Sequence, residues 1–243
     1  MVAESSSGHP LDNAVWASLT GGHEGKAEVV GSARRYHPDV SEFAAVECFT
    51  GGSWADLARL AGPAGRVVLF RDVVPPPPPG WTEQTRGAAT QMVLPAGALL
   101  DPPSDLAVVP IGRGDLAQVL DLVALAKPGP FRSRTVDMGR FWGSFEDGRL
   151  VALAGERLHP DGFTEISAVC THPDHRRRGL GAAVTHRVAT ELVEEGLVPF
   201  LHVATQNEVA QRVYEGLGFE VRRSVEFVVT GPMVGAARGQ APT

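Results

Sequence analysis

The sequence of 243 residues predicts an α+β fold, in which a mixed, mostly antiparallel central sheet flanked by helices is preceded by a smaller α/β domain. Apolar runs broken by Asp147-Gly148 and Asp161-Gly162 are typical of hairpins and predict a meander of strands from Phe145 to Thr171. Directly after the meander, a basic, glycine-containing turn leads into a helical pattern from Ala182 to Glu195.

The first part of the chain alternates short apolar runs with a proline-rich stretch, and we expect residues 1–100 to form one domain and residues 101–243 a second. Ser53 is a suitable N-cap for the helical pattern that follows it. No phosphate-binding loop and no nucleophile beside a base occurs in residues 1–100, so this domain is expected to be structural or to shape a substrate site. Its predicted helices are 11–19 and 53–61, and its predicted strands are 27–36, 43–49, 66–71 and 91–94.

Outside the meander, the second part of the chain also has clear periodicity. Asp115 is the expected N-cap of a helix whose apolar residues share one face. The segment from Phe131 to Trp142 interleaves arginines with aromatic residues, which indicates either an amphipathic helix covering the sheet or a stretch that lines a substrate pocket. The other predicted elements here are a strand at 106–111, the helix 116–126, a strand at 198–204, a helix at 207–215 and one or two strands in 219–229.

Composition excludes several classes of function. The net charge of −6 gives no support for nucleic-acid binding. Cys48 and Cys170 have neither metal-ligand spacing nor the pattern of a disulfide framework, so we expect no metal and a reducing, cytoplasmic setting. No apolar run is long enough to span a bilayer, and the first residues lack the features of a secretory signal, so no membrane partner is expected.

The turn after the meander has the composition of an anion site. It reads Arg176-Arg-Arg-Gly179-Leu-Gly181 and lies between a strand and a helix. Free N–H groups and the dipole of a helix N-terminus favour an anion, and the glycines allow close approach of a phosphate to the backbone. A solvated basic turn is the alternative, which the two glycines and the preceding strand make less favoured.

Two further marks accompany this turn. Asn207 and Tyr214 lie on one face of the predicted helix and precede Glu215-Gly-Leu217-Gly218-Phe219. Glu165 precedes Arg176 by eleven residues, on the last strand of the meander. In an uninterrupted strand, Glu165, Ser167 and Val169 face one side of the sheet and Cys170 faces the other.

These three marks, in this order of elements, show that residues 105 to about 230 resemble the GNAT superfamily, the acetyl-CoA-dependent N-acyltransferases. Residues 1–100 resemble a degenerate copy of the same fold that lacks the basic glycine turn. The resemblance implies acetyl-CoA as co-substrate and catalytic roles for Glu165 as general base and Tyr214 as general acid. Residues expected to bind the co-substrate are Val169, Cys170, Thr171, Arg176, Arg177, Arg178, Gly179, Leu180, Gly181, Ala182 and Asn207.

The implied reaction is direct attack of a primary amine, on a small molecule or a peptide, on the thioester in a ternary complex. A non-catalytic protein that binds or senses acyl-CoA is the alternative. Three of these residues also have a purely structural role as the alternative: Asn207 as a helix N-cap, Tyr214 as a packing residue and Cys170 as a buried apolar side chain. These patterns leave the acceptor and the oligomeric state open.

Overall fold

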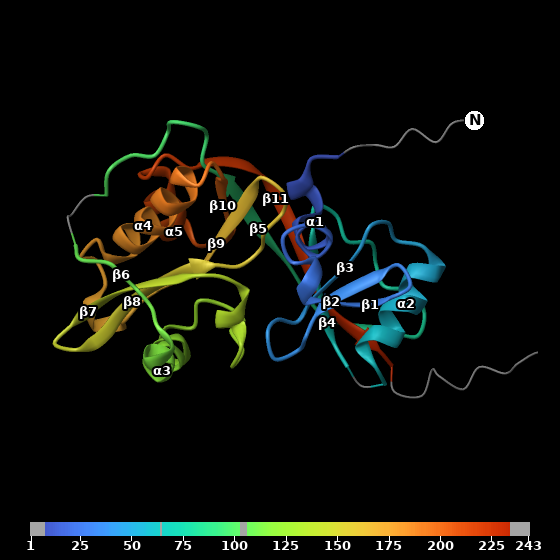
Figure 1. Ribbon diagram of the computed structural model, residues 1–243. Helices are drawn as coiled ribbons and strands as arrows, with labels where there is room; N and C mark the ends of the chain where they lie inside the picture. Colours follow the sequence, from blue (N-terminus) through green and yellow to red (C-terminus); the bar gives the residue numbers. More distant parts are fainter. Residues whose placement is uncertain (1–7, 64, 103–105, 234–243) are drawn as a thin grey trace, which may run out of the picture.

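The computed structural model describes residues 8–63, 65–102 and 106–233, and within them the strands form one eleven-stranded sheet that runs through both halves of the molecule (Figure 1). The order across the sheet is β1-β2-β3-β4-β11-β5-β10-β9-β8-β7-β6. Neighbours are antiparallel except for the pairs β3/β4 and β9/β10. The predicted mixed, mostly antiparallel sheet is therefore confirmed. Its strands are β1 (Ala27–Val30), β2 (Ala33–Tyr36), β3 (Phe43–Val46), β4 (Val67–Arg71), β5 (Trp81–Val93), β6 (Val109–Pro110), β7 (Phe141–Glu146), β8 (Arg149–Glu156), β9 (Phe163–Thr171), β10 (Val198–Ala204) and β11 (Glu220–Pro232).

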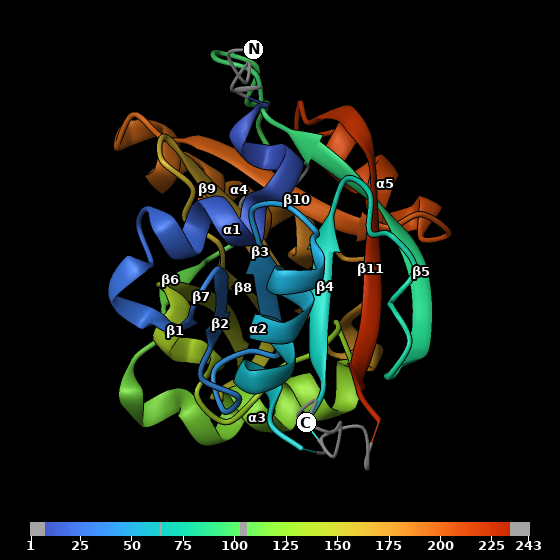
Figure 2. The same ribbon diagram turned by 90° about the vertical axis from the view of Figure 1, so that its right-hand side faces the viewer.

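Helices cover both faces of each half. In the N-terminal half, α1 and α2 lie on opposite faces of strands β2 to β4 (Figure 2), and they bury separate apolar clusters against them. In the C-terminal half, α3 covers one face, while α4 and α5 cover the other (Figure 1). The α-helices are α1 (Ala14–Thr20), α2 (Gly51–Ala61), α3 (Leu116–Ala126), α4 (Leu180–Glu194) and α5 (Glu208–Glu215). Short 3₁₀ turns are η1 (Pro10–Asn13), η2 (Glu24–Lys26), η3 (Arg113–Asp115), η4 (Thr135–Met138) and η5 (Pro173–His175).

Two long strands join the halves. β5, from the first hundred residues, pairs with β11 along its length and with β10 through Ala89–Val93. β11, from the end of the chain, also pairs with β4 through Glu226–Thr230. The division into domains at residues 100 and 101 stays a prediction, and residues 103–105, just after this boundary, lie outside the described residues. The strands show that each half donates a strand to the other.

The two halves repeat one unit. In each, a strand, a helix and a parallel strand follow one another, as β3-α2-β4 in the first half and β9-α4-β10 in the second. In each, the second strand of the unit pairs on its other side with a long strand from the opposite half. This arrangement supports the interpretation of residues 1–100 as a degenerate copy.

Several local expectations differ from the structure. The single strand expected at 27–36 is a hairpin of β1 and β2. Helix α2 begins before Ser53, because Thr50 is its N-cap and exchanges hydrogen bonds with Ser53 in a capping box. Asp115 is the N-cap residue of α3, as expected, but its side chain makes no capping bond to α3, because its carboxylate accepts from the N–H of Gly112. The segment from Phe131 to Trp142 forms no α-helix; it forms the single turn η4 and then enters β7.

The meander is confirmed. Asp147 and Gly148 both have positive φ, which matches the twist of a two-residue hairpin between β7 and β8. Asp161 and Gly162 form the next turn, where β8 leads to β9. None of the helices in the part of the chain that the structure describes has the length and apolar character needed to cross a membrane.

Candidate active site

The parallel strands β9 and β10 pair at one end and then separate. Their register joins Phe163–Ile166 to Val198–Leu201, and the remaining residues of both strands have no pairing across this boundary. The gap opens on the side where β9 leads into the basic turn and α4. A strand edge without a partner presents unpaired N–H and C=O groups, so the gap is suited to an extended ligand.

A β-bulge in β9 lies beside this gap. Leu153 pairs with Cys170 whereas Gly155 pairs with Ser167, so one residue is extra on β9. Ala168 at the bulge has φ +54°, which lies in the left-handed region. The bulge reverses the alternation of the strand, so that Val169 packs on the α4 side with Ile166 while Cys170 packs on the α3 side. Glu165 and Val169 therefore lie on opposite faces, contrary to the expectation for an uninterrupted strand.

Strand alternation also determines which backbone N–H groups of residues 169–172 face the gap. The N–H of His172 donates to the carbonyl of Val151, toward β8. Because neighbouring residues of a strand point their N–H groups in opposite directions, Thr171 and, two residues earlier, Val169 present theirs to the gap.

The turn after β9 forms an anion cradle at the start of α4. Gly179 is the N-cap of α4 with φ +81°, and Arg177 also has a positive φ of 62°. Successive N–H groups in such a turn converge, and the first N–H groups of a helix have no intrahelical partner. A Cβ at Gly181 would lie 3.7 Å from the hydroxyl of Thr171, so the helix start lies close to the end of β9.

The three arginines of the cradle are exposed but differ in their contacts. Arg178 forms a bidentate ion pair with Glu146 of the β7–β8 hairpin. Within the described residues, the side chains of Arg176 and Arg177 make no ion pair, so both are available to an anion. Nε2 of His175 also lies 2.8 Å from a carboxylate oxygen of Glu146. The Glu146 carboxylate therefore covers part of the cradle.

Tyr214 lies in the apolar cluster between the sheet and α4 and α5. Its ring contacts Phe219 edge-on, and its hydroxyl forms no hydrogen bond with any described residue. Burial raises the pKa of Tyr214, and the nearby Cys170 thiol adds to this effect, so the phenol stays protonated at neutral pH. Burial also raises the pKa of Cys170 to about 12, which makes this thiol a poor nucleophile.

Glu165 lies on the other face of the sheet, fully buried beneath the N-terminal half. Its carboxylate accepts two hydrogen bonds from the guanidinium of Arg157 and one, at 2.7 Å, from Nδ1 of His202. Burial alone would raise the pKa of Glu165, but Arg157 and His202 outweigh it and lower the pKa to about 2. The structure thus does not bring Glu165 together with Tyr214.

His202 connects this ion pair to the first half of the chain. Burial lowers the pKa of His202 in spite of the neighbouring carboxylate, so the ring is neutral at pH 7. With Nδ1–H donating to Glu165, its Nε2 accepts from the amide nitrogen of Gln91 on β5, at 2.9 Å. The amide oxygen of Gln91 in turn accepts from Arg222 of β11. This buried network is built from both halves.

The sequence did not single out Arg157, His202 or Gln91. Arg157 could have been found, because a hairpin turn centred on Asp161 pairs it with Glu165. His202 and Gln91 gave no local signal, since they meet Glu165 only through strand pairing across the sheet. Asn207 is the N-cap of α5, where its Oδ1 accepts from the N–H of Ala210.

A helix N-terminal cradle beside separated parallel strands, with a protonated tyrosine from the next helix, agrees with the resemblance to acyltransferases that the sequence suggested. The FR47-like protein family matches residues 142–228, which contain the bulge, the cradle and Tyr214.

A solved structure from Novosphingobium aromaticivorans DSM 12444, described as an acetyltransferase of the GNAT family, is 35% identical, covers 93% of this chain and 99% of its own, and superposes with a TM-score of 0.85. The chain belongs to the GNAT family of acetyltransferases. A GCN5-related N-acetyltransferase from Kribbella flavida shares the fold at 20% identity, with a TM-score of 0.62 over 89% of this chain and 95% of its own.

Curated relatives match over a shorter span. A mycothiol acetyltransferase from Thermomonospora curvata is 34% identical over 87 residues, which is 35% of this chain and 29% of the relative. One from Mycolicibacterium gilvum is 30% identical over 105 residues, 40% of this chain and 35% of the relative. The match thus spans about a third of these relatives, and it supports acetyl transfer without assigning an acceptor.

Proposed function

We propose that the protein transfers the acetyl group of acetyl-CoA to a primary amine, which attacks the thioester directly in a ternary complex. The observation that carries this proposal is the opening of the sheet between β9 and β10 directly beside the cradle at the start of α4. An extended, anionic thioester fits such a site, because its arm needs an unpaired strand edge and its phosphates need N–H donors. The alternative, a non-catalytic acyl-CoA sensor, is not favoured by the family.

The residues of the cradle and of β9 would hold the co-substrate. Backbone N–H groups from Arg177 to Ala182, including those of Gly179, Leu180 and Gly181, would bind the pyrophosphate, and the side chains of Arg176, Arg177 and Arg178 would add charge. The backbone of Val169, Cys170 and Thr171 would pair with the pantetheine arm and polarise the thioester carbonyl. Asn207 stays a predicted contact of the co-substrate. In the structure it is the N-cap of α5.

Tyr214 is the group that we assign as general acid. A phenol kept protonated by burial, with a hydroxyl that no described residue binds, can donate a proton to the departing thiolate. Because the Cys170 thiol is also protonated, an acyl-enzyme on that residue is disfavoured and the amine attacks the thioester itself.

The role of Glu165 as general base stays a prediction, and its surroundings weigh against it. A carboxylate with a pKa of about 2 that accepts three hydrogen bonds has little affinity for a further proton. We infer that Glu165 instead fixes Arg157 and His202, and that the ammonium proton of the acceptor leaves through solvent.

Thiol release from acetyl-CoA, followed with a panel of amines, tests the proposed function. We expect release that depends on the amine, with an N-acetylated product detected by mass spectrometry. Calorimetric binding of CoA without turnover on any amine would instead support the sensor alternative.

A further inference from the structure

Side chains from four neighbouring strands form a continuous chain of hydrogen bonds across the sheet. Arg222 of β11 donates from Nη1 to the amide oxygen of Gln91 on β5, at 2.8 Å. The amide nitrogen of Gln91 lies 2.9 Å from Nε2 of His202 on β10, and Nδ1 of His202 lies 2.7 Å from the carboxylate of Glu165 on β9. Since β11, β5, β10 and β9 are adjacent in this order, each strand contributes one residue to this polar ladder.

The hydrogen bonds of the polar ladder all run in one direction. A guanidinium can only donate and an ionised carboxylate can only accept, so Arg222 and Glu165 determine the two ends. Gln91 therefore turns its oxygen to Arg222 and donates to Nε2 of His202, which leaves Nδ1 as the protonated nitrogen of the ring. Hydrogen bonds aligned in this way polarise one another and strengthen the chain.

The polar ladder is buried, and both of its ends are paired. Asp12, which precedes α1, pairs with Arg222. Arg157, at the end of β8, pairs with Glu165. The side chain of His202 between them is only 4% exposed. Buried polar groups are costly unless their partners are present, so a satisfied network of this kind specifies one arrangement of the strands that carry it.

The polar ladder crosses the sheet where β9 and β10 separate. The last residues of these two strands in register are Ile166 and Leu201, and His202 is the next residue of β10. Beyond this point, in the described part of the chain, β10 pairs only with β5, and β9 has its bulge at Ala168 and pairs only with β8. The bond from His202 to Glu165 therefore ties β9 to β10 at the vertex of the gap.

The N-terminal half reaches this vertex through β5. Gln91 on that strand binds His202, and its amide nitrogen also donates to the carbonyl of Leu11 in η1, at 2.9 Å. At the far end of the polar ladder, the register of β11 with β5 shifts around Arg222, which is the extra residue of a bulge. The side chain of this bulged residue turns to Gln91 and Asp12.

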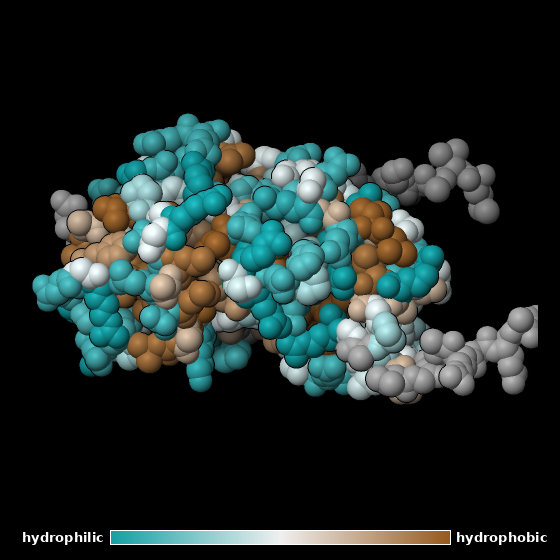
Figure 3. All heavy atoms as spheres, turned by 60° about the horizontal axis from the view of Figure 1, so that its bottom comes forward, coloured by the Kyte–Doolittle hydropathy of each residue, from teal (hydrophilic) through white to brown (hydrophobic). Residues whose placement is uncertain are grey.

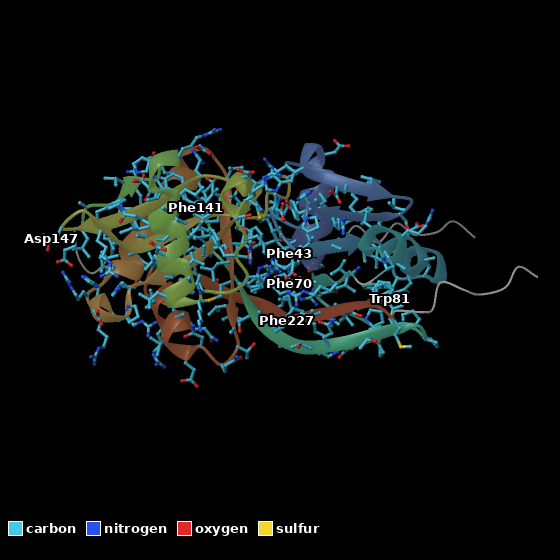
Figure 4. The ribbon with its side chains drawn as sticks, turned by 90° about the horizontal axis from the view of Figure 1, so that it is seen from below. Phe43, Phe70, Trp81, Phe141, Asp147 and Phe227 are labelled. Atoms are coloured by element: carbon cyan, nitrogen blue, oxygen red, sulfur yellow. The ribbon has the colours of Figure 1, made fainter. Side chains whose placement is uncertain are left out.

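The polar ladder lies inside the molecule, away from ligands. The ring of His202 contacts Phe70 edge-on, with ring centres 4.4 Å apart. Figure 4 shows Phe70 beside Phe43 where the two halves meet. The surface over this junction is hydrophilic on the α3 side (Figure 3), whereas Gln91 and Glu165 are fully buried. Any effect of these side chains on a bound thioester therefore passes through the strands.

We infer, on the basis of the proposed function, that His202 and Gln91 are positioning residues for the donor site, because the polar ladder fixes the vertex of the gap that receives acetyl-CoA. Parallel strands gain backbone hydrogen bonds when their pairing extends and lose them when it retracts, so an untied vertex moves along the strands. A molecule with a displaced vertex lacks the competent gap, and the apparent affinity falls with the competent fraction. The N-terminal half thereby serves the donor site without contacting the donor.

Two substitutions of His202 separate its two hydrogen bonds. In His202→Asn the amide nitrogen replaces Nδ1 and keeps the bond to Glu165 on β9. In His202→Gln the longer side chain replaces Nε2 and keeps only the bond to Gln91 on β5. Calorimetry with CoA and steady-state kinetics with acetyl-CoA then measure what each bond contributes to donor binding.

The bond across the vertex should decide donor affinity. We expect His202→Gln to raise Kd for CoA and KM for acetyl-CoA about five- to tenfold, because the competent gap is then present in roughly a tenth to a fifth of the molecules. His202→Asn should raise both by less than about twofold, and kcat should change by less than about twofold in either variant. An unchanged Kd in His202→Gln overturns the inference. An equal rise in His202→Asn, or a fall in kcat without a rise in Kd, overturns it as well.

Ser18→Ala is the matched control, since it removes a buried hydrogen bond between the halves away from the gap. The hydroxyl of Ser18 accepts from the N–H of His159, at 2.8 Å. Its loss should lower the urea midpoint and leave Kd for CoA unchanged. A Kd raised as much as in His202→Gln would assign the effect to general loss of packing and overturn the role of the polar ladder.

Arg222→Gln tests the other end of the polar ladder should neither variant of His202 fold. Its side chain is 22% exposed, and we expect its loss to raise Kd about two- to fivefold, the effect of one hydrogen bond. An unchanged Kd there refutes the inference. Wild-type protein that binds CoA but acetylates no primary amine contradicts the proposed function alone, since Kd still decides the role of the polar ladder. Wild-type protein that binds no CoA overturns both.

Discussion

Replacing Glu165 by glutamine removes the negative charge of the buried ion pair and keeps the size of the side chain. Folding lowers the pKa of this fully buried carboxyl from 4.5 to about 2. A carboxyl with that change contributes about 3 kcal/mol to the free energy of unfolding at neutral pH. We expect Glu165→Gln to lower the free energy of unfolding at pH 7 by about 3 kcal/mol, in the range for breaking a buried pair by removing one partner.

The sign of the pH dependence follows from the direction of the shift. A carboxyl whose pKa is lowered by folding stabilises fully above the pKa of the unfolded chain, 4.5, and loses this contribution as the pH falls toward about 2. The difference between wild type and variant should therefore shrink below about pH 5. Urea unfolding of both proteins over that range measures the difference, and a difference that does not depend on pH would refute the assigned pKa.

The same variant distinguishes a structural carboxylate from a catalytic base. Loss of a general base lowers kcat by about 10² to 10⁴ and removes the acidic limb of the pH profile. We expect kcat per folded molecule to fall by much less than this factor, and its pH profile to stay the same. A fall of about 100-fold or more in kcat per folded molecule would show that Glu165 accepts the proton after all. Glu195→Gln is the matched control, because Glu195 pairs with Arg140 at the surface, where a pair is worth about 0 to 1 kcal/mol.

Three further variants address the donor side. Tyr214→Phe should lower kcat by roughly 10²-fold while calorimetric CoA affinity and the urea midpoint stay the same, and an intact kcat would contradict the acid role. Ala168→Val should destabilise the fold by more than about 1 kcal/mol in urea, since a β-branched residue tolerates φ +54° poorly. Ala168→Gly should not destabilise it, and equal stability of the two variants would contradict the bulge geometry. Glu146→Gln should tighten CoA binding about two- to fivefold at low salt by freeing Arg178, and calorimetry showing weaker binding would contradict this.

Local patterns predicted most of the elements correctly because their causes are local. The hairpin at Asp147-Gly148, the helix after Gly179 and the strand from Val198 follow from turn chemistry and hydrophobic period. The bulge was not predicted, since an alanine at positive φ leaves no mark in the sequence. Of the two alternatives for Phe131–Trp142, the amphipathic helix is excluded, because Phe131 and Phe141 pack into the cluster between α3 and the sheet and not along a helix face.

The candidate site was predictable to different degrees on its two sides. The cradle on the donor side occupies one continuous stretch, so spacing alone located it. The surroundings of Arg157 are assembled from the loop before β3, the segment after α3 and the end of β8, which lie far apart in the chain. Only strand pairing brings Arg157, Glu165 and His202 together, and no pattern within the sequence encodes the pairing of β5 with β10.

The exchange of long strands explains why the two repeated units can differ in function. β4 and β10 each need a neighbour on their outer side, and each receives it from the other half, as β11 and β5. The halves are thereby held in a fixed relation, with the loop before β3 against the segment after α3. The unit β9-α4-β10 keeps the glycine-rich cradle and the separated strands, which suit the donor. The unit β3-α2-β4 begins its helix with the capping box of Thr50 and Ser53, which satisfies the N–H groups that a phosphate would need. On the other side of the same unit, Phe43 and Glu42 contact the C-terminal half beside Arg157 and Arg132. Of the two repeated units, β9-α4-β10 is therefore the one whose helix start is suited to a phosphate.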